Sequence, residues 1–152
     1  METRIKGIFS RNLVTIKEAD NIMNADFLMN QYGIRHLPVL DKEDYLVGIL
    51  STTDYMALKR LSIDLQEYRV KDLMSAPVKT FASNTRVKSV AQLFITKKIN
   101  SGLVMEGDEI AGIVTSEDLL MLLAQHKDGV DLENLDMEAL AGEGWISATQ
   151  LL

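Results

Sequence analysis

A hydroxyl side chain and a carboxylate stand three residues apart at two places in the chain. Ser51 is followed by Asp54, and Thr115 is followed by Asp118, each pair at the start of a stretch with helical spacing. In a capping box these two groups satisfy the unpaired N–H groups at a helix N-terminus. The same N-terminus attracts anionic ligands, because its N–H groups and the helix dipole are partly positive. Capping alone explains both pairs, and it is compatible with ligand binding at the same place.

The two pairs belong to a longer internal repeat. The matched segments, at an offset of 65 residues and then of 64, are 5–10 with 70–75, 13–16 with 78–81, 34–40 with 99–105, and 47–54 with 111–118. The agreement lies in the apolar, Gly, Ser/Thr and Asp positions more than in strict identity. A duplicated unit predicts a pseudo-symmetric molecule with two related clefts.

Within each copy the hydrophobic period changes in the same order. Residues 13–16 are short, apolar and β-branched, as is typical of a strand. From 18 to 31 the apolar residues recur at helical spacing, and Gly33 is expected to end that helix, because glycine adopts a left-handed backbone at little cost. A hairpin over 37–50 and a helix after Asp54 complete the unit. The sequence therefore predicts strand, helix, strand, strand, helix, twice over.

This order, together with two motifs, resembles a known family. The motifs are LPVLD at 37–41 and VGILSTTD at 47–54. Residues 5 to about 125 resemble a tandem pair of CBS domains, a Bateman module. The resemblance implies a mixed α/β (α+β) fold of two β-α-β-β-α repeats packed with pseudo-two-fold symmetry. The expected organisation is repeat 1 at 5–61, a linker at 62–69, repeat 2 at 70–125 and an acidic C-terminal tail at 126–152.

The resemblance also implies where a ligand binds. In CBS domain pairs the Asp that ends the second motif hydrogen-bonds the ribose hydroxyls of an adenosine ligand, which here points to Asp54 and Asp118. An ionised carboxylate only accepts and two vicinal hydroxyls both donate, so this contact is short and strong. The favoured cleft is expected to contain Asp54, Ser51, Thr53, Arg35, His36 and Thr80. The second, weaker cleft is expected to contain Asp118, Thr115 and Thr15.

The two expected clefts differ in charge. Asn100 and Ser101 stand where the first copy has its two basic residues, and Glu117 stands where the first copy has Thr53, so its negative charge is expected to repel phosphate. We therefore expect a phosphate-bearing ligand beside Asp54. Beside Asp118 we expect a nucleoside with little or no negative charge, or no ligand. The expected ligands are AMP, ADP or ATP, with S-adenosylmethionine as an alternative, and no cofactor is required.

Each of these residues also has a purely structural interpretation. Arg35 and His36 suit a solvated connection between a helix and a strand. Thr15 and Thr80 are β-branched residues that suit strands by themselves. A metal site at His36 is not expected, because no Cys or His cluster lies near it in the sequence.

Composition narrows the classes of function. The 152 residues are 47% hydrophobic and 25% charged, which is typical of a globular protein, and the net charge of −6 disfavours a nucleic-acid partner. There is no cysteine. The longest apolar run, at 119–124, is far shorter than the roughly 20 residues that span a membrane. No membrane association and no secretory leader are expected, so we expect a cytoplasmic location.

Two hypotheses of function remain. The chain shows no P-loop, dinucleotide fingerprint, nucleophile–base arrangement or metal-ligand spacing, so it is not expected to be an enzyme. The first hypothesis is a regulatory module that binds an adenine nucleotide in a cleft between the repeats and signals to a partner protein through altered packing. The alternative is a ligand-independent dimerisation or protein-interaction module that acts through the helices and the C-terminal tail.

The end of the second repeat bears on that alternative. Residues 119–123 are apolar all round, which predicts burial on both sides. We therefore expect a homodimer that forms through the helices after Asp54 and Asp118, with a client protein that the sequence does not identify. In the tail, residues 131–140 suit a short acidic helix, and Trp145 is either part of a loosely attached terminus or docks on a partner.

Overall fold

The computed structural model describes residues 3–9, 11 and 13–125 of the chain. The first half contains β1 (Ile16–Lys17), α1 (Ile22–Tyr32), β2 (His36–Leu40), β3 (Leu46–Ser51) and α2 (Thr52–Arg60). The second half contains β4 (Thr80–Ala82), α4 (Val87–Lys97), β5 (Ser101–Glu106), β6 (Glu109–Thr115) and α5 (Ser116–Gln125). Short helices precede or link these units: η1 (Ile5–Gly7), η2 (Leu65–Glu67) and α3 (Val70–Leu73). The predicted order of strand, helix, strand, strand, helix is confirmed in both halves.

Helix α1 shows how local sequence sets an element. The side chain of Asn21 caps its first turn by accepting a backbone N–H bond. Ile22, Ala25 and Met29 form its buried face, as the apolar spacing predicts. The helix ends at Gly33, whose φ of 62° lies in the left-handed region, so the predicted stop is confirmed. Because the helix ends there, the chain turns into β2, and the residues between α1 and β2 lie at the edge of the sheet.

The first strand of the chain is shorter than predicted. It was expected at 13–16, but β1 pairs with β2 only through Ile16 and Lys17. One residue earlier the parallel ladder would face Pro38, which has no N–H to donate. In the second half Leu103 occupies the matching position, and its N–H bonds to the carbonyl of Lys79 at 2.9 Å. Strand β4 accordingly begins at Thr80, the repeat position of Thr15, whereas β1 begins at Ile16.

The segments that lead into the two repeats are exchanged between the halves. Ile5 is fully buried in the hydrophobic cluster of the second half, and its N–H bonds to the carbonyl of Thr85 at 3.0 Å. Val70 is fully buried in the cluster of the first half, and its N–H bonds to the carbonyl of Asp20 at 2.8 Å. The segment before β1 therefore completes the core of the second half, and the segment before β4 completes the core of the first half.

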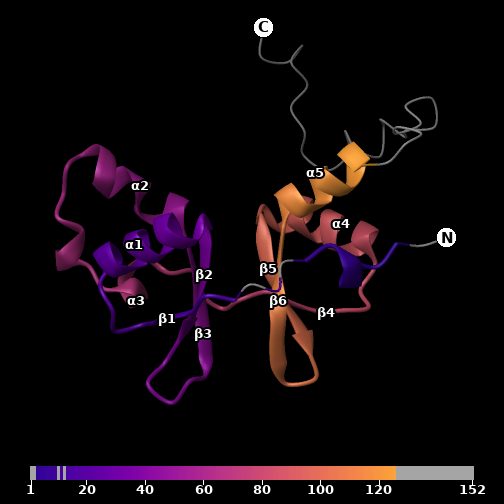
Figure 1. The fold of residues 1–152 in the computed structure, drawn as a ribbon, viewed down its shortest axis with the longest axis horizontal. Helices are drawn as coiled ribbons and strands as arrows, with labels where there is room; N and C mark the ends of the chain where they lie inside the picture. The colour runs from indigo at the N-terminus through magenta and orange to yellow at the C-terminus, as the bar shows by residue number, and fades with distance from the viewer. Residues whose placement is uncertain (1–2, 10, 12, 126–152) are drawn as a thin grey trace, which may run out of the picture.

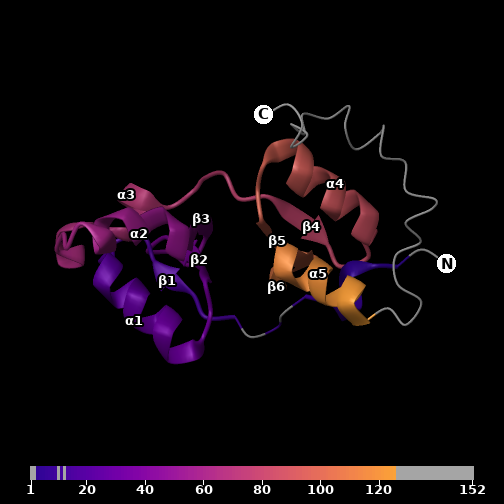
Figure 2. The same cartoon turned by 90° about the horizontal axis from the view of Figure 1, so that it is seen from above.

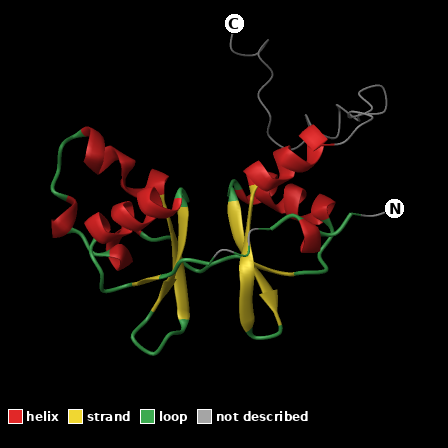
Figure 3. Cartoon of the chain, viewed as in Figure 1, coloured by secondary structure: helices red, strands yellow, loops and turns green. Residues whose placement is uncertain are grey.

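The halves form two separate three-stranded sheets, in the orders β1-β2-β3 and β4-β5-β6. The sheets lie next to each other at the middle of the molecule, and the helices cover their outer sides (Figures 1 and 3). The view from above shows the same arrangement, with α1 and α2 on one flank and α4 and α5 on the other (Figure 2). The two halves are thus related by approximate two-fold symmetry, and one hydrophobic cluster lies behind each sheet.

The predictions for the C-terminal tail, including the helix at 131–140 and the role of Trp145, lie outside the described residues. In the part of the chain that the structure describes, no helix combines the length and apolar character needed to cross a membrane.

Candidate functional site

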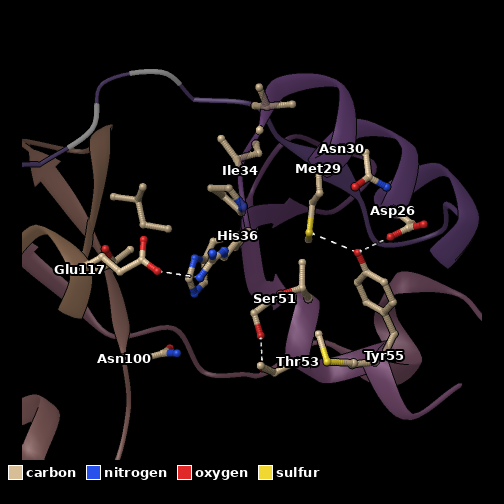
Figure 4. Close-up of a pocket in the computed structure, with 18 of the residues that line it drawn as sticks. Asp26, Met29, Asn30, Ile34, His36, Ser51, Thr53, Tyr55, Asn100 and Glu117 are labelled. Carbon is tan, nitrogen blue, oxygen red and sulfur yellow. Dashed lines mark hydrogen bonds and ion pairs between the residues drawn. The ribbon is translucent and has the colours of Figure 1, made fainter. Parts of the chain in front are cut away.

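A cavity of about 870 Å³ lies between the two halves, where the start of β2 and the end of β3 approach the β6–α5 junction (Figure 4). Six predicted site residues line it: Arg35, His36, Ser51, Thr53, Thr115 and Asp118. Three others are outside its lining among the described residues: Asp54, Thr80 and Thr15. Both threonines are exposed, and Leu13 and Val14, next to Thr15, line the cavity instead. Residues expected in two clefts therefore surround one cavity.

The β3–α2 junction is a capping box, as the spacing predicted. The Ser51 N–H donates to Asp54 Oδ2 at 2.7 Å, and the Ser51 hydroxyl donates to the same oxygen at 3.2 Å. Ser51 Oγ also hydrogen-bonds Thr53 Oγ1 at 2.7 Å. The carboxylate of Asp54 is thus turned back onto the start of its own helix, while the two hydroxyls line the cavity.

The β6–α5 junction repeats this geometry on the opposite wall. The Thr115 N–H donates to Asp118 Oδ2 at 2.7 Å, and the Thr115 hydroxyl lies 3.1 Å from the same oxygen. The N–H of Asp118 points back to that hydroxyl at 3.4 Å. Both capping residues line the cavity here. Capping and access to the cavity are therefore combined at Asp118.

An ion pair joins the two halves at the cavity. Arg35 Nη1 lies 2.6 Å from Glu117 Oε1, although the residues are 82 positions apart. The sequence interpretation treated Arg35 as a phosphate contact and Glu117 as a repelling charge, each in a different cleft. The side chains are 70% and 66% exposed, so the pair adds at most about 1 kcal/mol to stability. Its importance lies in the charge it removes from the cavity wall.

His36 is a partly buried titratable residue of the cavity wall. Its Nε2 atom is buried and has no hydrogen-bond partner among the described residues. Burial lowers the pKa of His36 below its ordinary value of 6.5, against the raising effects of the Asn100 side chain and of the Asp54 and Glu117 carboxylates. Burial therefore favours the neutral imidazole over the charged one at the cavity wall.

A second polar cluster, which the sequence interpretation missed, lines the first-half end of the cavity. Asp26 of α1 accepts two contacts from Lys59 Nζ of α2, at 3.0 and 3.1 Å. The Tyr55 hydroxyl donates to Asp26 Oδ1 at 3.0 Å. Burial, followed by this hydrogen bond, raises the pKa of Tyr55. Helical spacing marks Asp26 as adjacent to a buried face, but the sequence offers no signal that brings α2 beside it.

The remaining lining is largely apolar, with a small excess of negative charge. The apolar residues include Leu13, Val14, Ile34, Pro38 and Ile113. The charged residues are Arg35 and Lys59 against Asp26, Glu117 and Asp118. Among the described residues, no group of three or more His, Cys, Asp or Glu side chains is placed to hold a metal ion.

Fold and cavity together define a class: a tandem pair of similar α/β units that encloses a ligand-sized cavity between them. The CBS domain family matches residues 5–59 and 70–125 of this chain. The chain therefore belongs to the CBS domain family, which confirms the resemblance seen in the sequence.

Two solved structures illustrate the relationship. The CBS domain pair of protein MJ0100, in complex with 5′-methylthioadenosine and S-adenosyl-L-methionine, is 27% identical, with a TM-score of 0.72 over 82% of this chain and 98% of that one. An uncharacterised conserved protein from Pyrococcus horikoshii is 23% identical, with a TM-score of 0.73 over 84% of this chain and 96% of that one. The second likeness shows the fold alone, whereas the first concerns a pair that binds adenosine compounds.

Curated relatives are much longer than this chain. An L-aspartate semialdehyde sulfurtransferase from Methanocaldococcus jannaschii is 29% identical over 127 residues, which cover 82% of this chain and 24% of the relative. A homoserine O-acetyltransferase from Methanohalobium evestigatum is 28% identical over 124 residues, which cover 81% of this chain and 24% of the relative. The chain thus spans about a quarter of the length of these two relatives.

Proposed function

We propose that the cavity between the two CBS domains binds an adenosine-containing ligand, and that binding regulates a partner protein by changing how the halves pack. One observation carries the proposal: residues of both halves line a single cavity of about 870 Å³. Small-molecule sites typically measure roughly 300–1,000 Å³. The adenosine compounds in the complex of the related pair, which is 27% identical, support the class of ligand.

The charges of the lining favour an adenosine compound without net negative charge over AMP, ADP or ATP. Both cations of the described lining already have a carboxylate partner: Arg35 contacts Glu117 and Lys59 contacts Asp26. The lowered pKa of His36 removes the third candidate cation. A phosphate group would have to displace these pairs and face an excess of negative charge. This reverses the preference for phosphate that the sequence suggested.

The two kinds of wall suit the two parts of adenosine. Val14, Ile34 and Ile113 provide apolar surface for the base. Asp118 suits the ribose, because the hydrogen bonds that described residues donate to it end on Oδ2. Its Oδ1 atom is therefore available to accept from a ribose hydroxyl. In this arrangement Asp118, and not Asp54, is the carboxylate that recognises the ligand.

Regulation follows from the position of the cavity. A ligand that contacts both walls stabilises the packing of the halves in which those walls have the matching separation. It shifts the equilibrium only by the difference between its affinities for the two packings. A partner protein that binds one packing then responds to the concentration of the ligand.

Thermal unfolding with 5′-methylthioadenosine, S-adenosylmethionine, AMP and ATP tests the proposal. A ligand at about 100 times its Kd adds roughly 2.7 kcal/mol of stability, which is on the order of 5–10 °C for a protein of this size. We expect a shift with the first two compounds, a smaller one with AMP and ATP, and loss of the shift in Asp118→Asn.

Asp54→Asn is the matched control, because Asp54 caps α2 as Asp118 caps α5 but does not line the cavity. The Asp54→Asn variant measures the loss of stability caused by changing a helix cap while the cavity lining stays the same. This variant is therefore expected to keep the ligand-induced shift in unfolding temperature. A shift that disappears in Asp54→Asn and persists in Asp118→Asn would contradict the proposed site. The absence of any shift would contradict the proposed ligand class.

A specific feature of α5 favours a second function, dimerisation. Leu120, Met121 and Leu123 are 63%, 59% and 50% exposed in the single chain. We propose that α5 pairs with a second copy of the chain, which would cover these side chains. Such a homodimer is compatible with ligand binding, and by itself it constitutes the ligand-independent alternative.

A further inference from the structure

We infer that the first-half end of the cavity, formed by Asp26, Lys59 and Tyr55, is a subsite for the zwitterionic amino-acid group of an adenosyl ligand. The inference rests on the adenosine-binding function proposed for the same cavity, and it specifies what the ligand carries beyond the adenosine.

The subsite is an organised pair of opposite charges. Lys59 Nζ contacts both carboxylate oxygens of Asp26, at 3.0 and 3.1 Å, and the Tyr55 hydroxyl holds Oδ1 at 3.0 Å. Tyr55 is 1% exposed, so it anchors the carboxylate from the interior. The side chain of Asp26 keeps 21% of its surface exposed and that of Lys59 keeps 47%. Both charges are thus fixed in place and remain accessible at the wall of the cavity.

The cavity has room for a substituent beyond adenosine. Its volume of about 870 Å³ lies near the upper end of the range for drug-sized ligands. Glu117 and Asn100 of the second half lie at one side, and Asp26 and Tyr55 lie at the other, with Ser51 between them (Figure 4). An adenosine held by Asp118 leaves the side of Asp26 unfilled, so the 5′ substituent is the part of the ligand that reaches it.

The opposite charges of Asp26 and Lys59 at the first-half end of the cavity match a ligand group that carries both a positive and a negative charge. The ammonium of an amino acid pairs with Asp26, and the carboxylate on the same carbon pairs with Lys59, so each wall charge keeps an opposite charge beside it. A phosphate satisfies Lys59 but faces Asp26 without compensation. Met29 and Met56 also line this region, and their flexible thioethers suit the sulfur and methylene groups that join an amino acid to adenosine.

Isothermal titration calorimetry with two matched ligands tests the subsite. S-adenosylhomocysteine and 5′-methylthioadenosine share the adenosine and the thioether, but only the first carries the amino-acid group. We expect the wild type to bind S-adenosylhomocysteine at least about tenfold more tightly, because the amino-acid group adds two charge-assisted contacts at partly exposed side chains. Lys59→Met should reduce this advantage, because the carboxylate of the ligand loses its cation, and 5′-methylthioadenosine, which lacks the amino-acid group, serves as the reference ligand in the same variant.

Lys42→Met is the control, because Lys42 lies in the β2–β3 turn with its side chain 88% exposed and paired with Glu43. It should keep the tenfold advantage. Equal affinities for the two ligands in the wild type, or an advantage that is undiminished in Lys59→Met, would overturn the subsite and leave the adenosine site unaffected. Failure of both ligands to bind the wild type would overturn the adenosine function and the subsite together.

Discussion

His36 combines a buried atom and a titratable ring at the wall of the cavity. Its Nε2 atom has no partner among the described residues, and burial lowers the pKa of the ring despite the nearby carboxylates of Asp54 and Glu117. Protonation would place a charge where water does not reach it, and Arg35 opposes it further. The folded chain therefore prefers the neutral ring, which makes His36 a source of pH-dependent stability.

We predict that the free energy of unfolding falls as the pH falls from about 6.5 toward 5. In this window the unfolded chain takes up a proton on His36 that the folded chain resists, and one proton changes the free energy by at most about 1.4 kcal/mol per pH unit. Urea unfolding of the wild type and of His36→Gln across this range measures the effect. The variant is expected to show a shallower slope, with the curves parallel above pH 7. Equal slopes below pH 6.5 would refute the role of His36.

Among the described residues, helix α5 packs against the core on one side. Leu119 packs against the cluster of the second half, whereas Leu120, Met121 and Leu123 are at least half exposed. An apolar helix stabilises a fold through the face it buries, and its outward apolar residues gain free energy only when another surface covers them. The helix therefore serves two purposes: its first turn positions Asp118 at the cavity, and its outward face suits a second copy of the chain.

We predict that Leu120→Glu converts a dimer into a monomer in sedimentation equilibrium. Leu120 is 63% exposed, so the change costs the single chain little, while a buried unpaired carboxylate at an interface is strongly unfavourable. Tyr45→Glu is the control, because Tyr45 is 71% exposed but lies at the β2–β3 turn. A wild type that sediments as a monomer at micromolar concentration would rule out the proposed dimer.

At the scale of the whole molecule, the exchanged segments tie the halves together. Ile5 completes the core of the second half and Val70 completes the core of the first. Neither half keeps a full core if the other unfolds and withdraws its leading segment. The cavity lies between these interlocked halves, so a ligand that bridges them acts on both halves together.

We predict a single unfolding transition in which both halves are lost together, even when only one core is weakened. Ile5→Ala removes a fully buried side chain and should cost about 2–5 kcal/mol. Amide signals of Ala25 in the first half and Val90 in the second, followed by NMR through a urea titration, should disappear at the same midpoint. Val70→Ala weakens the core of the first half instead, and it should also give one common midpoint for both halves. Earlier unfolding of the second half alone in Ile5→Ala would show that the halves are independent.

The sequence by itself determined the repeat, the order of the elements and the end of α1 at Gly33, but not where the helices begin. The apolar spacing of α1, its stop at Gly33 and the cap at Ser51 depend on interactions within a few residues, so they are visible in the order of the amino acids. The shortened first strand follows from Pro38, whose missing N–H matters only once the parallel register is known.

Only the tertiary structure decided the composition of the cavity. Arg35 meets Glu117 across 82 residues, and Lys59 meets Asp26 across 33. These pairings depend on how the halves and their helices are oriented, and no local pattern specifies that orientation. They turn Arg35, which was expected to contact phosphate, into a neutralised ion pair, and they neutralise Lys59 as well. The physical reason is that the charge of a site is the sum over all elements that converge on it, whereas a motif reports only the element that carries it.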